Sequence, residues 1–214
     1  MIDHNSTDDE QIAALKAAWK EHGRAIFTGV ILGVCVLVGW NYWQSYKLAR
    51  AQEGAELFNQ VERALELNDT PTMENGVALL EEKYGGTPYL ALGKLALAKL
   101  KAETGDYPAA QQALSWVVSN ANDVETRDLA KLRLAAVHNA TGNYQAALDL
   151  LSSGISDAFS SLADEHRGDA YGGLGQLEEA RAAYDQALQN APGAEFLQWK
   201  RDSLGDAVVT GDAS

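Results

Sequence analysis

The sequence has a single cysteine and few cationic side chains for a chain of 214 residues. Cys35 lies within an apolar stretch, where a thiol packs as a small hydrophobic group, and there is no second cysteine with which it could form an intramolecular disulfide. Helical domains of this size do not need disulfides to fold, even in an oxidising space. The cysteine content therefore excludes an internal disulfide and does not indicate a compartment.

Positive charge is scarce, above all in the C-terminal part of the chain. The whole sequence has 17 Lys and Arg against 30 Asp and Glu, and residues 47–214 have 14 against 25, which is a net charge of −11. Nucleic-acid affinity comes largely from cations that displace the counterions of phosphates, and a surface this negative repels phosphate groups. We therefore expect no nucleic-acid partner.

Residue patterns typical of catalysis or metal binding are also missing. The sequence has four isolated histidines: His4, His22, His138 and His166. No two of them have the spacing of metal ligands, and no cysteine can complete such a set. The acidic residues near His166, namely Asp164, Glu165 and Asp169, would point in several directions on a helix, so we expect a solvated face there. We predict no catalytic residue, no metal, no cofactor and no enzymatic activity.

The one long stretch without a formal charge runs from Ala25 to Tyr46 and has 22 residues. As a helix it would measure about 33 Å, against a hydrocarbon thickness of about 30 Å. A cleaved signal peptide is the alternative, but the stretch ends in Trp and Tyr, which suit a membrane interface, rather than in the small residues of a cleavage site. We predict a transmembrane helix at residues 25–46, in contact with membrane lipid.

The cations that flank this stretch do not decide its orientation. Three lie on each side: Lys16, Lys20 and Arg24 before it, and Lys47, Arg50 and Arg63 after it. Translocation of a long C-terminal domain is largely insensitive to charge, so we expect the N-terminus to lie inside. Residues 1–24 would then be a cytoplasmic leader with a short amphipathic helix, which Gly23 can end.

Gly29 and Gly33 form a GxxxG pattern within the predicted span. Such a pair lets another transmembrane helix approach closely, although glycine is common in membrane helices in general. Packing against a partner transmembrane helix is one reading of Gly29 and Gly33, and the ordinary glycine content of membrane helices is the other.

After residue 46, apolar residues recur every three or four positions, which predicts helices, and no alternating strand pattern appears. The segment from Gly168 to Pro192 has the small and aromatic residues of the 34-residue tetratricopeptide pattern at the expected positions. These are Gly168, Tyr171, Gly175, Ala180, Tyr184, Ala187 and Pro192. The fold class is therefore all-α, a transmembrane helix followed by a solenoid of tetratricopeptide-like repeats.

Two earlier copies of the repeat are recognisable. They contain Gly105, Tyr107 and Ala110, and Gly142, Tyr144 and Ala147. The turn glycines Gly105, Gly142 and Gly175 are 37 and 33 residues apart, close to one repeat length. Small residues would let the two helices of a hairpin cross closely at Ala98, Ala135 and Gly168, and we expect the repeat tyrosines to pack between helices rather than to bind a ligand.

Further helices are predicted at both ends of the repeats. Residues 48–67 and 72–84 indicate a divergent first helix pair. Phe196, Trp199 and Leu204 lie on a predicted terminal helix, which we expect to cover the exposed face of the last repeat. The repeat domain would span residues 47–208, and residues 209–214 would be a frayed tail.

The chain resembles the YfgM family, ancillary subunits of the bacterial SecYEG translocon, most specifically in its N-terminal part. The resemblance is carried by Glu10-Gln11-Ile12-Ala13-Ala14-Leu15-Lys16, by Gly29-Val30-Ile31-Leu32-Gly33-Val34, and by Gly39-Trp40 with Tyr42-Trp43. It covers nearly the whole chain and implies a Gram-negative inner-membrane protein with a periplasmic repeat domain. It also implies the SecYEG translocon, a PpiD-like periplasmic chaperone and emerging polypeptides as partners.

Three functions follow in order of support. The first is a non-catalytic translocon subunit that helps pass translocated polypeptides to the periplasmic chaperones, supported by the resemblance and the repeats. The second is a membrane-anchored scaffold for another envelope assembly such as cytochrome maturation, supported by the repeats alone. The third is an enzyme with a hidden site at His138 or His166, supported only by scattered residues.

Overall fold

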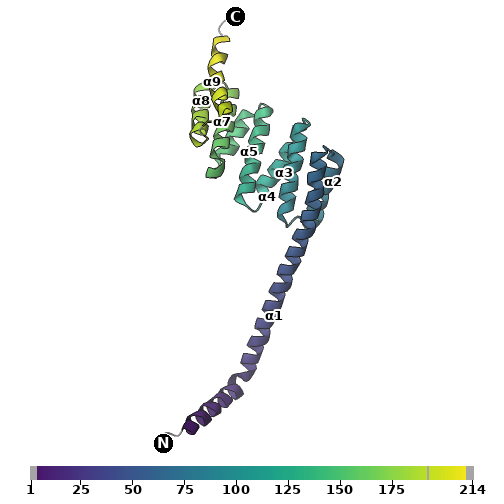
Figure 1. Ribbon diagram of the computed structural model, residues 1–214, viewed down its shortest axis with the longest axis vertical. Coiled ribbons are helices and arrows are strands. Elements are labelled where there is room, and N and C mark those ends of the chain that lie inside the picture. Colours follow the sequence, from purple (N-terminus) through teal and green to yellow (C-terminus); the bar gives the residue numbers. More distant parts are fainter. Residues whose placement is uncertain (1–3, 192, 211–214) are drawn as a thin grey trace. The chain divides into compact units, whose positions relative to one another are not determined.

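The computed structural model describes the backbone of residues 4–191 and 193–210, with side chains described for residues 12, 13, 16, 19, 20, 24, 27–191 and 193–204. Every regular element in these residues is helical, which confirms the predicted fold class (Figure 1). The elements are α1 (His4–Glu66), α2 (Thr70–Tyr84), α3 (Pro88–Glu103), α4 (Tyr107–Asn120), α5 (Val124–Ala140), α6 (Tyr144–Ser152), the 3-10 turn η1 (Asp157–Phe159), α7 (Ser160–Gly173), α8 (Leu177–Asn190) and α9 (Glu195–Thr210). The chain divides into two units between Arg50 and Ala51.

The first unit consists of the N-terminal part of α1. The prediction that Gly23 ends the leader helix is wrong, because α1 continues through this residue. Glycine lowers helix stability by about 1 kcal/mol relative to alanine, which does not by itself stop a long helix. The side chains from Phe27 to Lys47 are exposed, and α1 is long and apolar enough to cross a membrane.

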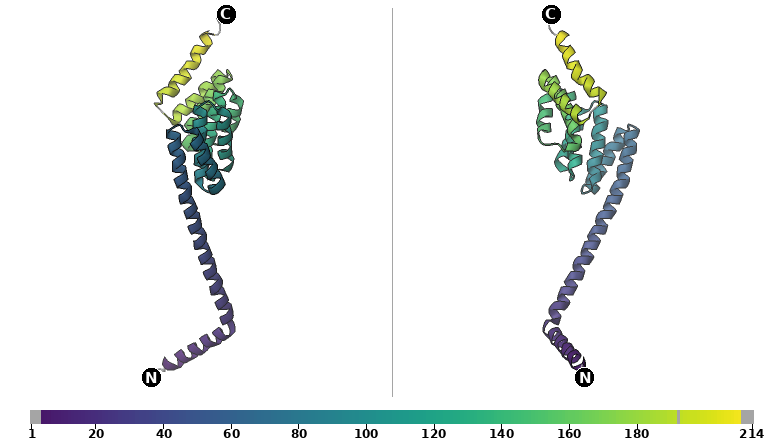
Figure 2. Two further views of the ribbon diagram at one scale, coloured as in Figure 1. Left: turned by 90° about the vertical axis from the view of Figure 1, so that its right-hand side faces the viewer. Right: turned by 60° about the vertical axis from the view of Figure 1, so that its left-hand side comes forward.

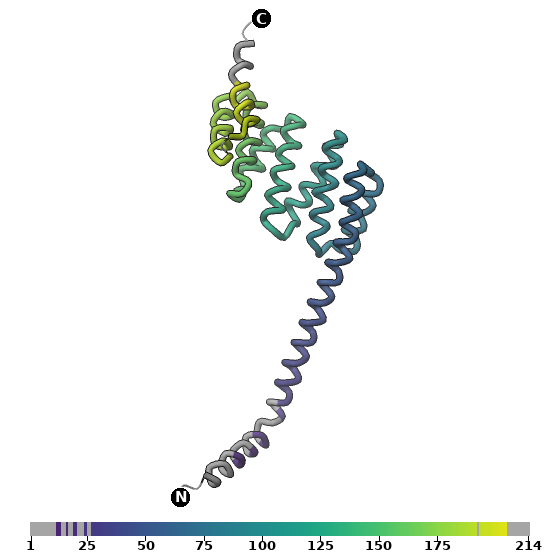
Figure 3. The backbone as a smooth tube through the Cα atoms, viewed as in Figure 1, coloured from purple at the N-terminus to yellow at the C-terminus, as the bar shows by residue number. Residues whose placement is uncertain are grey.

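The second unit is a stack of helical hairpins. The hairpins α3 with α4, α5 with α6, and α7 with α8 follow one another side by side, and the C-terminal part of α1 pairs with α2 (Figures 2 and 3). Neighbouring hairpins share their buried side chains; for example Leu95 of α3, Leu114 of α4 and Leu134 of α5 belong to one apolar cluster. Each hairpin therefore buries its apolar face against the next, as in other repeat solenoids.

Aspartate caps set the start of several helices. Asp69, Asp106 and Asp123 each accept a hydrogen bond from a backbone N–H in the first turn of the following helix, at 3.2, 3.3 and 2.7 Å. A side-chain oxygen in this position satisfies one of the N–H groups that the helix leaves free. In α2 and α4 a proline also occupies the first turn, where its missing N–H costs nothing.

The last helix covers the final repeat with Leu204, as the sequence predicts, and with Leu197, which the sequence analysis did not name. Leu197 is 5% exposed, and Leu197 and Leu204 pack with the buried residues of α8. Phe196 and Trp199 are 60% and 65% exposed, so the expectation that they cover the repeat is wrong. Leu197 and Leu204 are seven residues apart and share one helix face, whereas Phe196 and Trp199 lie on another. Pro192 and residues 211–214 of the expected tail lie outside the described residues.

Candidate functional site

The apolar part of α1 ends in a group of aromatic and cationic side chains. The rings of Trp40 and Trp43 lie 5.3 Å apart, and Lys47 Nζ lies 3.9 Å from the centroid of the Trp43 ring. Arg50 Nη1 donates a hydrogen bond to the Tyr46 hydroxyl at 2.7 Å. Rings that keep their bodies in lipid while cations reach toward water are typical of a membrane–water interface.

Gly29 and Gly33 lie on an open surface of α1. A β carbon at either position would meet no atom within 4 Å among the described residues. A partner helix could approach α1 closely here, but no described segment does so. Packing of a transmembrane helix at Gly29 and Gly33 stays a prediction.

The three turn glycines share one backbone geometry. Gly105, Gly142 and Gly175 have φ values of +81°, +74° and +75°. In each turn the residue after the glycine donates its N–H to the carbonyl five residues earlier: Asp106 to Lys101, Asn143 to His138 and Gln176 to Tyr171, at 2.8, 2.8 and 2.9 Å. This is the glycine-terminated helix end known as the Schellman motif, which closes one helix and starts the next. The repeated turn therefore fixes the repeated hairpin.

Small residues bring the helices of the repeats into close contact. The alanines at the predicted repeat positions are buried, namely Ala98, Ala110, Ala135, Ala147, Ala180 and Ala187. A β carbon at Gly168 would come within 2.6 Å of the Tyr184 ring, and one at Gly173 would collide with the Tyr144 ring. Tyr107 and Tyr171 pack against the apolar clusters of their own repeats. In this structure the repeat tyrosines fill space between helices.

A cluster of charged residues links α7, α8 and α9. Lys200 Nζ donates to Glu165 at 2.8 Å and to both oxygens of Asp169 at 2.7 and 2.9 Å. The Tyr184 hydroxyl donates to Asp169 at 2.7 Å, and His166 Nδ1 lies 3.7 Å from the same carboxylate. The expectation of a solvated face is therefore wrong for Glu165, His166 and Asp169. It is also wrong for Asp164, which is buried and pairs with Arg167. It missed Lys200, which is separated from them by more than thirty residues of sequence.

The electrostatics of this cluster favour the ionised carboxylate. Burial by itself raises the pKa of Asp169, but its contacts with His166, Lys200 and Tyr184 lower the pKa to about 2. Burial, and then the hydrogen bond to Asp169, raise the pKa of the Tyr184 hydroxyl. An ionised, fully paired carboxylate of this kind is not poised to exchange protons near neutral pH, so the cluster is suited to holding α9 on the last repeat.

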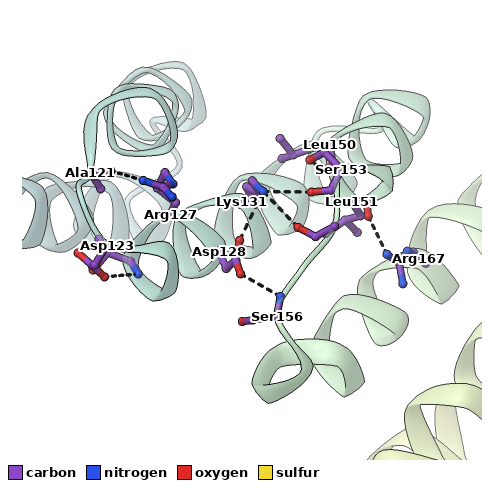
Figure 4. Close-up of polar contacts among 12 residues, drawn as sticks. Ala121, Asp123, Arg127, Asp128, Lys131, Leu150, Leu151, Ser153, Ser156 and Arg167 are labelled. Atoms are coloured by element: carbon purple, nitrogen blue, oxygen red, sulfur yellow. Dashed lines mark hydrogen bonds and ion pairs between the residues drawn. The ribbon is translucent and has the colours of Figure 1, made fainter.

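A second polar network holds the connection between α6 and α7 against α5 (Figure 4). Asp128 is 2% exposed and accepts a hydrogen bond from the Ser156 N–H at 2.9 Å. Lys131 Nζ donates to the carbonyl oxygens of Ser153 and Gly154 at 3.2 and 3.4 Å. Hydrogen bonds from Ser156 and Lys131 lower the pKa of Asp128 even though burial alone would raise it. The buried acid therefore binds the protein's own backbone.

The two histidines whose side chains the structure describes, His138 and His166, belong to separate environments. Burial lowers the pKa of His138 on α5, which favours its neutral form. His166 contacts Asp169 of the α7–α9 cluster, and the side chains of His4 and His22 lie outside the described residues. Within the described part of the chain, no group of three His, Cys, Asp or Glu side chains could hold a metal ion.

The fold resembles that of solved helical-repeat structures. MamA 41-end from Desulfovibrio magneticus RS-1 is 20% identical with a TM-score of 0.51 and covers 73% of this chain and 92% of its own. The MamA RS-1 ArsTM double mutant is 19% identical with a TM-score of 0.50 and covers 75% of this chain and 98% of its own. At this level of identity the similarity shows the helical-repeat fold alone.

Sequence relatives extend over nearly the whole chain. Residues 16–206 match the family described as "Tetratricopeptide repeat-like domain". The Ancillary SecYEG translocon subunit of Neisseria gonorrhoeae is 32% identical over 92% of this chain and 97% of its own. The proteins of the same name from Escherichia coli and Aggregatibacter actinomycetemcomitans are 27% and 28% identical, over 92% and 88% of this chain and 96% and 92% of their own. The resemblance seen in the sequence is thus confirmed, and the chain belongs to the tetratricopeptide repeat-like family of the ancillary SecYEG translocon subunits.

Proposed function

We propose that this chain is a non-catalytic ancillary subunit of the SecYEG translocon. The apolar part of α1 anchors it in the bacterial inner membrane, with the N-terminus in the cytoplasm and the repeat domain in the periplasm. There the repeat domain helps to pass translocated polypeptides to periplasmic chaperones, among them a PpiD-like protein. The observation that carries the proposal is that one chain joins an exposed apolar helix to a helical-repeat domain and matches relatives of that name along both parts.

The repeat domain supports a role in holding other chains. Stacked helical hairpins present an extended surface, and arrays of this kind commonly bind peptides. The acidic groups of the α7–α9 cluster and Asp128 bind residues of their own domain, which supports a structural rather than a catalytic role for them. The net charge of −11 for residues 47–214 keeps the repeat surface away from anionic lipid headgroups.

The association is tested by affinity purification of the full-length chain in mild detergent. We expect SecY and a PpiD homologue to be recovered with it. The matched control carries an unrelated transmembrane helix in place of residues 25–46, and it should recover less SecY if the anchor contributes to binding. Reproducible absence of SecY from the native preparation would contradict the proposal, and recovery of cytochrome-maturation components instead would favour the scaffold alternative.

The orientation is tested by proteolysis of inverted inner-membrane vesicles. A protease added outside these vesicles reaches only the cytoplasmic side of the membrane. We expect the repeat domain to survive until detergent opens the vesicles. Digestion of the repeats in intact vesicles would show that they face the cytoplasm.

A further inference from the structure

A small apolar pocket opens between α3 and α5, and we call it the Arg133 pocket. The last turns of α3, the middle of α5 and one residue of α4 line it: Ala98, Lys99, Ala102, Glu103, Leu114, Arg133, Ala136 and Val137. Its volume is about 260 Å³, which is below the roughly 300–1,000 Å³ of pockets for drug-sized ligands. The pocket exists because three of its lining residues are alanines, and its size suits one or two side chains of a peptide.

Arg133 lacks the acidic partner that Arg167, Arg181 and Arg201 have. No described carboxylate lies within 4 Å of its guanidinium, and its one hydrogen bond, from Nη1 to the carbonyl oxygen of Leu95, is 3.5 Å long. Arg167, by contrast, pairs with Asp164 and donates to the carbonyl oxygen of Leu151 at 2.7 Å. A guanidinium has five N–H donors, so most of the donors of Arg133 have no partner among the described residues.

The electrostatic setting of Arg133 favours an incoming anion. Burial lowers the pKa of its guanidinium, and no acidic neighbour offsets that effect, although arginine stays charged at neutral pH. The one acidic residue that lines the pocket is Glu103, whose exposed carboxylate lies 3.9 Å from Lys99 Nζ. This pair leaves Arg133 uncompensated, and a carboxylate next to a partly buried guanidinium forms strong, geometrically specific hydrogen bonds.

We propose that the Arg133 pocket binds an extended polypeptide segment in which an acidic side chain neighbours an apolar one. The apolar side chain enters between the alanines, and the Asp or Glu carboxylate accepts hydrogen bonds from Arg133. This inference rests on the proposed function, in which the repeat domain holds translocated polypeptides, and it assigns the chemistry by which a segment is chosen.

An internal acidic side chain fits the pocket better than a chain-terminal carboxylate does. Terminal carboxylates are typically captured by free backbone N–H groups. The residues that line the pocket lie in the interior of α5 and α4 and in the last turns of α3, where the backbone N–H groups are bonded within the helices. The guanidinium is therefore the strong donor that the pocket offers.

The test measures peptide binding to the full-length chain in lipid nanodiscs by fluorescence anisotropy. Four labelled Gly- and Ser-rich peptides are compared: one with a central Leu-Glu pair, one with Leu-Gln, one with Ser-Glu, and one with Leu next to a free C-terminal carboxylate as its only acid. Empty nanodiscs correct for partition into lipid. We expect the Leu-Glu peptide to bind about tenfold or more tightly than each of the others. Equal binding of Leu-Glu and Leu-Gln, or tightest binding of the free-carboxylate peptide, would overturn the proposal.

Variants assign the preference to Arg133. Arg133→Gln should bind Leu-Glu and Leu-Gln alike, whereas Arg133→Lys should keep a weaker preference because an ammonium group lacks the bidentate geometry. The matched control is Arg181→Gln, which removes an exposed arginine that pairs with Glu178 at 3.5 Å, outside the pocket. It should bind as the native chain does. An unchanged preference in Arg133→Gln would overturn the proposal.

A second variant and a second measurement separate loss of peptide binding from misfolding and from failure of the proposed function. If Arg133→Gln fails to fold by circular dichroism, Ala136→Leu fills the pocket while Arg133 remains, and it should also weaken binding of the Leu-Glu peptide. Recovery of SecY is measured on the same preparations. If the native chain recovers SecY but binds the Leu-Glu and Leu-Gln peptides equally, the pocket proposal alone is contradicted. If the native chain fails to recover SecY, the proposed function is contradicted.

Discussion

The ring of Tyr184 on α8 lies directly over Gly168 on α7. A β carbon at position 168 would come within 2.6 Å of Tyr184 Cε1, closer than van der Waals contact allows. The hydroxyl of the same tyrosine donates to Asp169, so the ring is fixed at both its edge and its tip. Because position 168 has no side chain, α7 and α8 can pack closely enough for the Tyr184 ring to lie on the backbone of α7. This position of the ring also places its hydroxyl in the polar cluster with Lys200.

Gly168→Ala should destabilise the repeat domain. The added methyl group must displace the Tyr184 ring, and overpacking of this kind costs about 1–3 kcal/mol, more than the helix propensity of alanine returns. Gly172→Ala is the matched control on the same helix, because its β carbon would meet Leu204 Cδ2 at an ordinary 3.6 Å. Thermal unfolding should show a lower Tm for Gly168→Ala and an equal or higher Tm for Gly172→Ala. Equal Tm values for the two variants would contradict the packing argument.

Gly142→Ala should destabilise through the backbone alone. Gly142 has a φ of +74°, and a β carbon there would meet no described atom within 4 Å. An L-residue in the left-handed region costs about 1–2 kcal/mol. Gly86→Ala is the control, since that glycine also has open space around it but lacks a positive φ. Denaturant unfolding should separate the two variants, and an unaffected Gly142→Ala would show that strain in this turn is relieved elsewhere.

The paired carboxylate of Asp169 predicts a loss of stability in acid. Its pKa is about 2 in the folded chain and 3.8 as an ordinary aspartate. A depressed folded pKa contributes stability above the ordinary pKa, and that contribution is lost as the pH falls from about 4 toward 2. Asp169→Asn should lower stability at neutral pH and flatten this part of the pH profile. A native and a variant curve that run parallel between pH 4 and 2 would contradict the assignment.

The faces of α9 predict opposite effects for two neighbouring residues. Leu197→Ala should destabilise by about 2–4 kcal/mol, because it leaves a cavity in the apolar cluster with α8. Trp199→Ser should change the free energy of unfolding little, since the ring is 65% exposed. Chemical denaturation measures both. A larger loss of unfolding free energy for Trp199→Ser than for Leu197→Ala would contradict this assignment of the two faces of α9.

Local patterns account for what could be predicted. The apolar stretch before residue 47 and the spacing of Gly105, Gly142 and Gly175 are properties of neighbouring residues, so the all-α fold and its repeats could be read directly from the sequence. The resemblance to the translocon subunits rested likewise on short runs near the N-terminus. The terminal helix and the contact of Leu204 could be predicted, but the exposure of Phe196 and Trp199 could not. Large apolar residues on a helix do not by themselves show which side meets the preceding repeat.

The sequence by itself determined a helical-repeat chain with one apolar helix, because helix periodicity, turn glycines and uncharged length are encoded residue by residue. Only the tertiary structure decided which distant side chains meet. Lys200 reaches Asp169 across 31 residues of sequence. Arg133 has no acid within ion-pair distance among the described residues, and it lies beside a pocket that the small alanines of α3 and α5 leave open. Whether a cationic side chain finds an acidic partner depends on how the hairpins stack, and local sequence patterns do not show this.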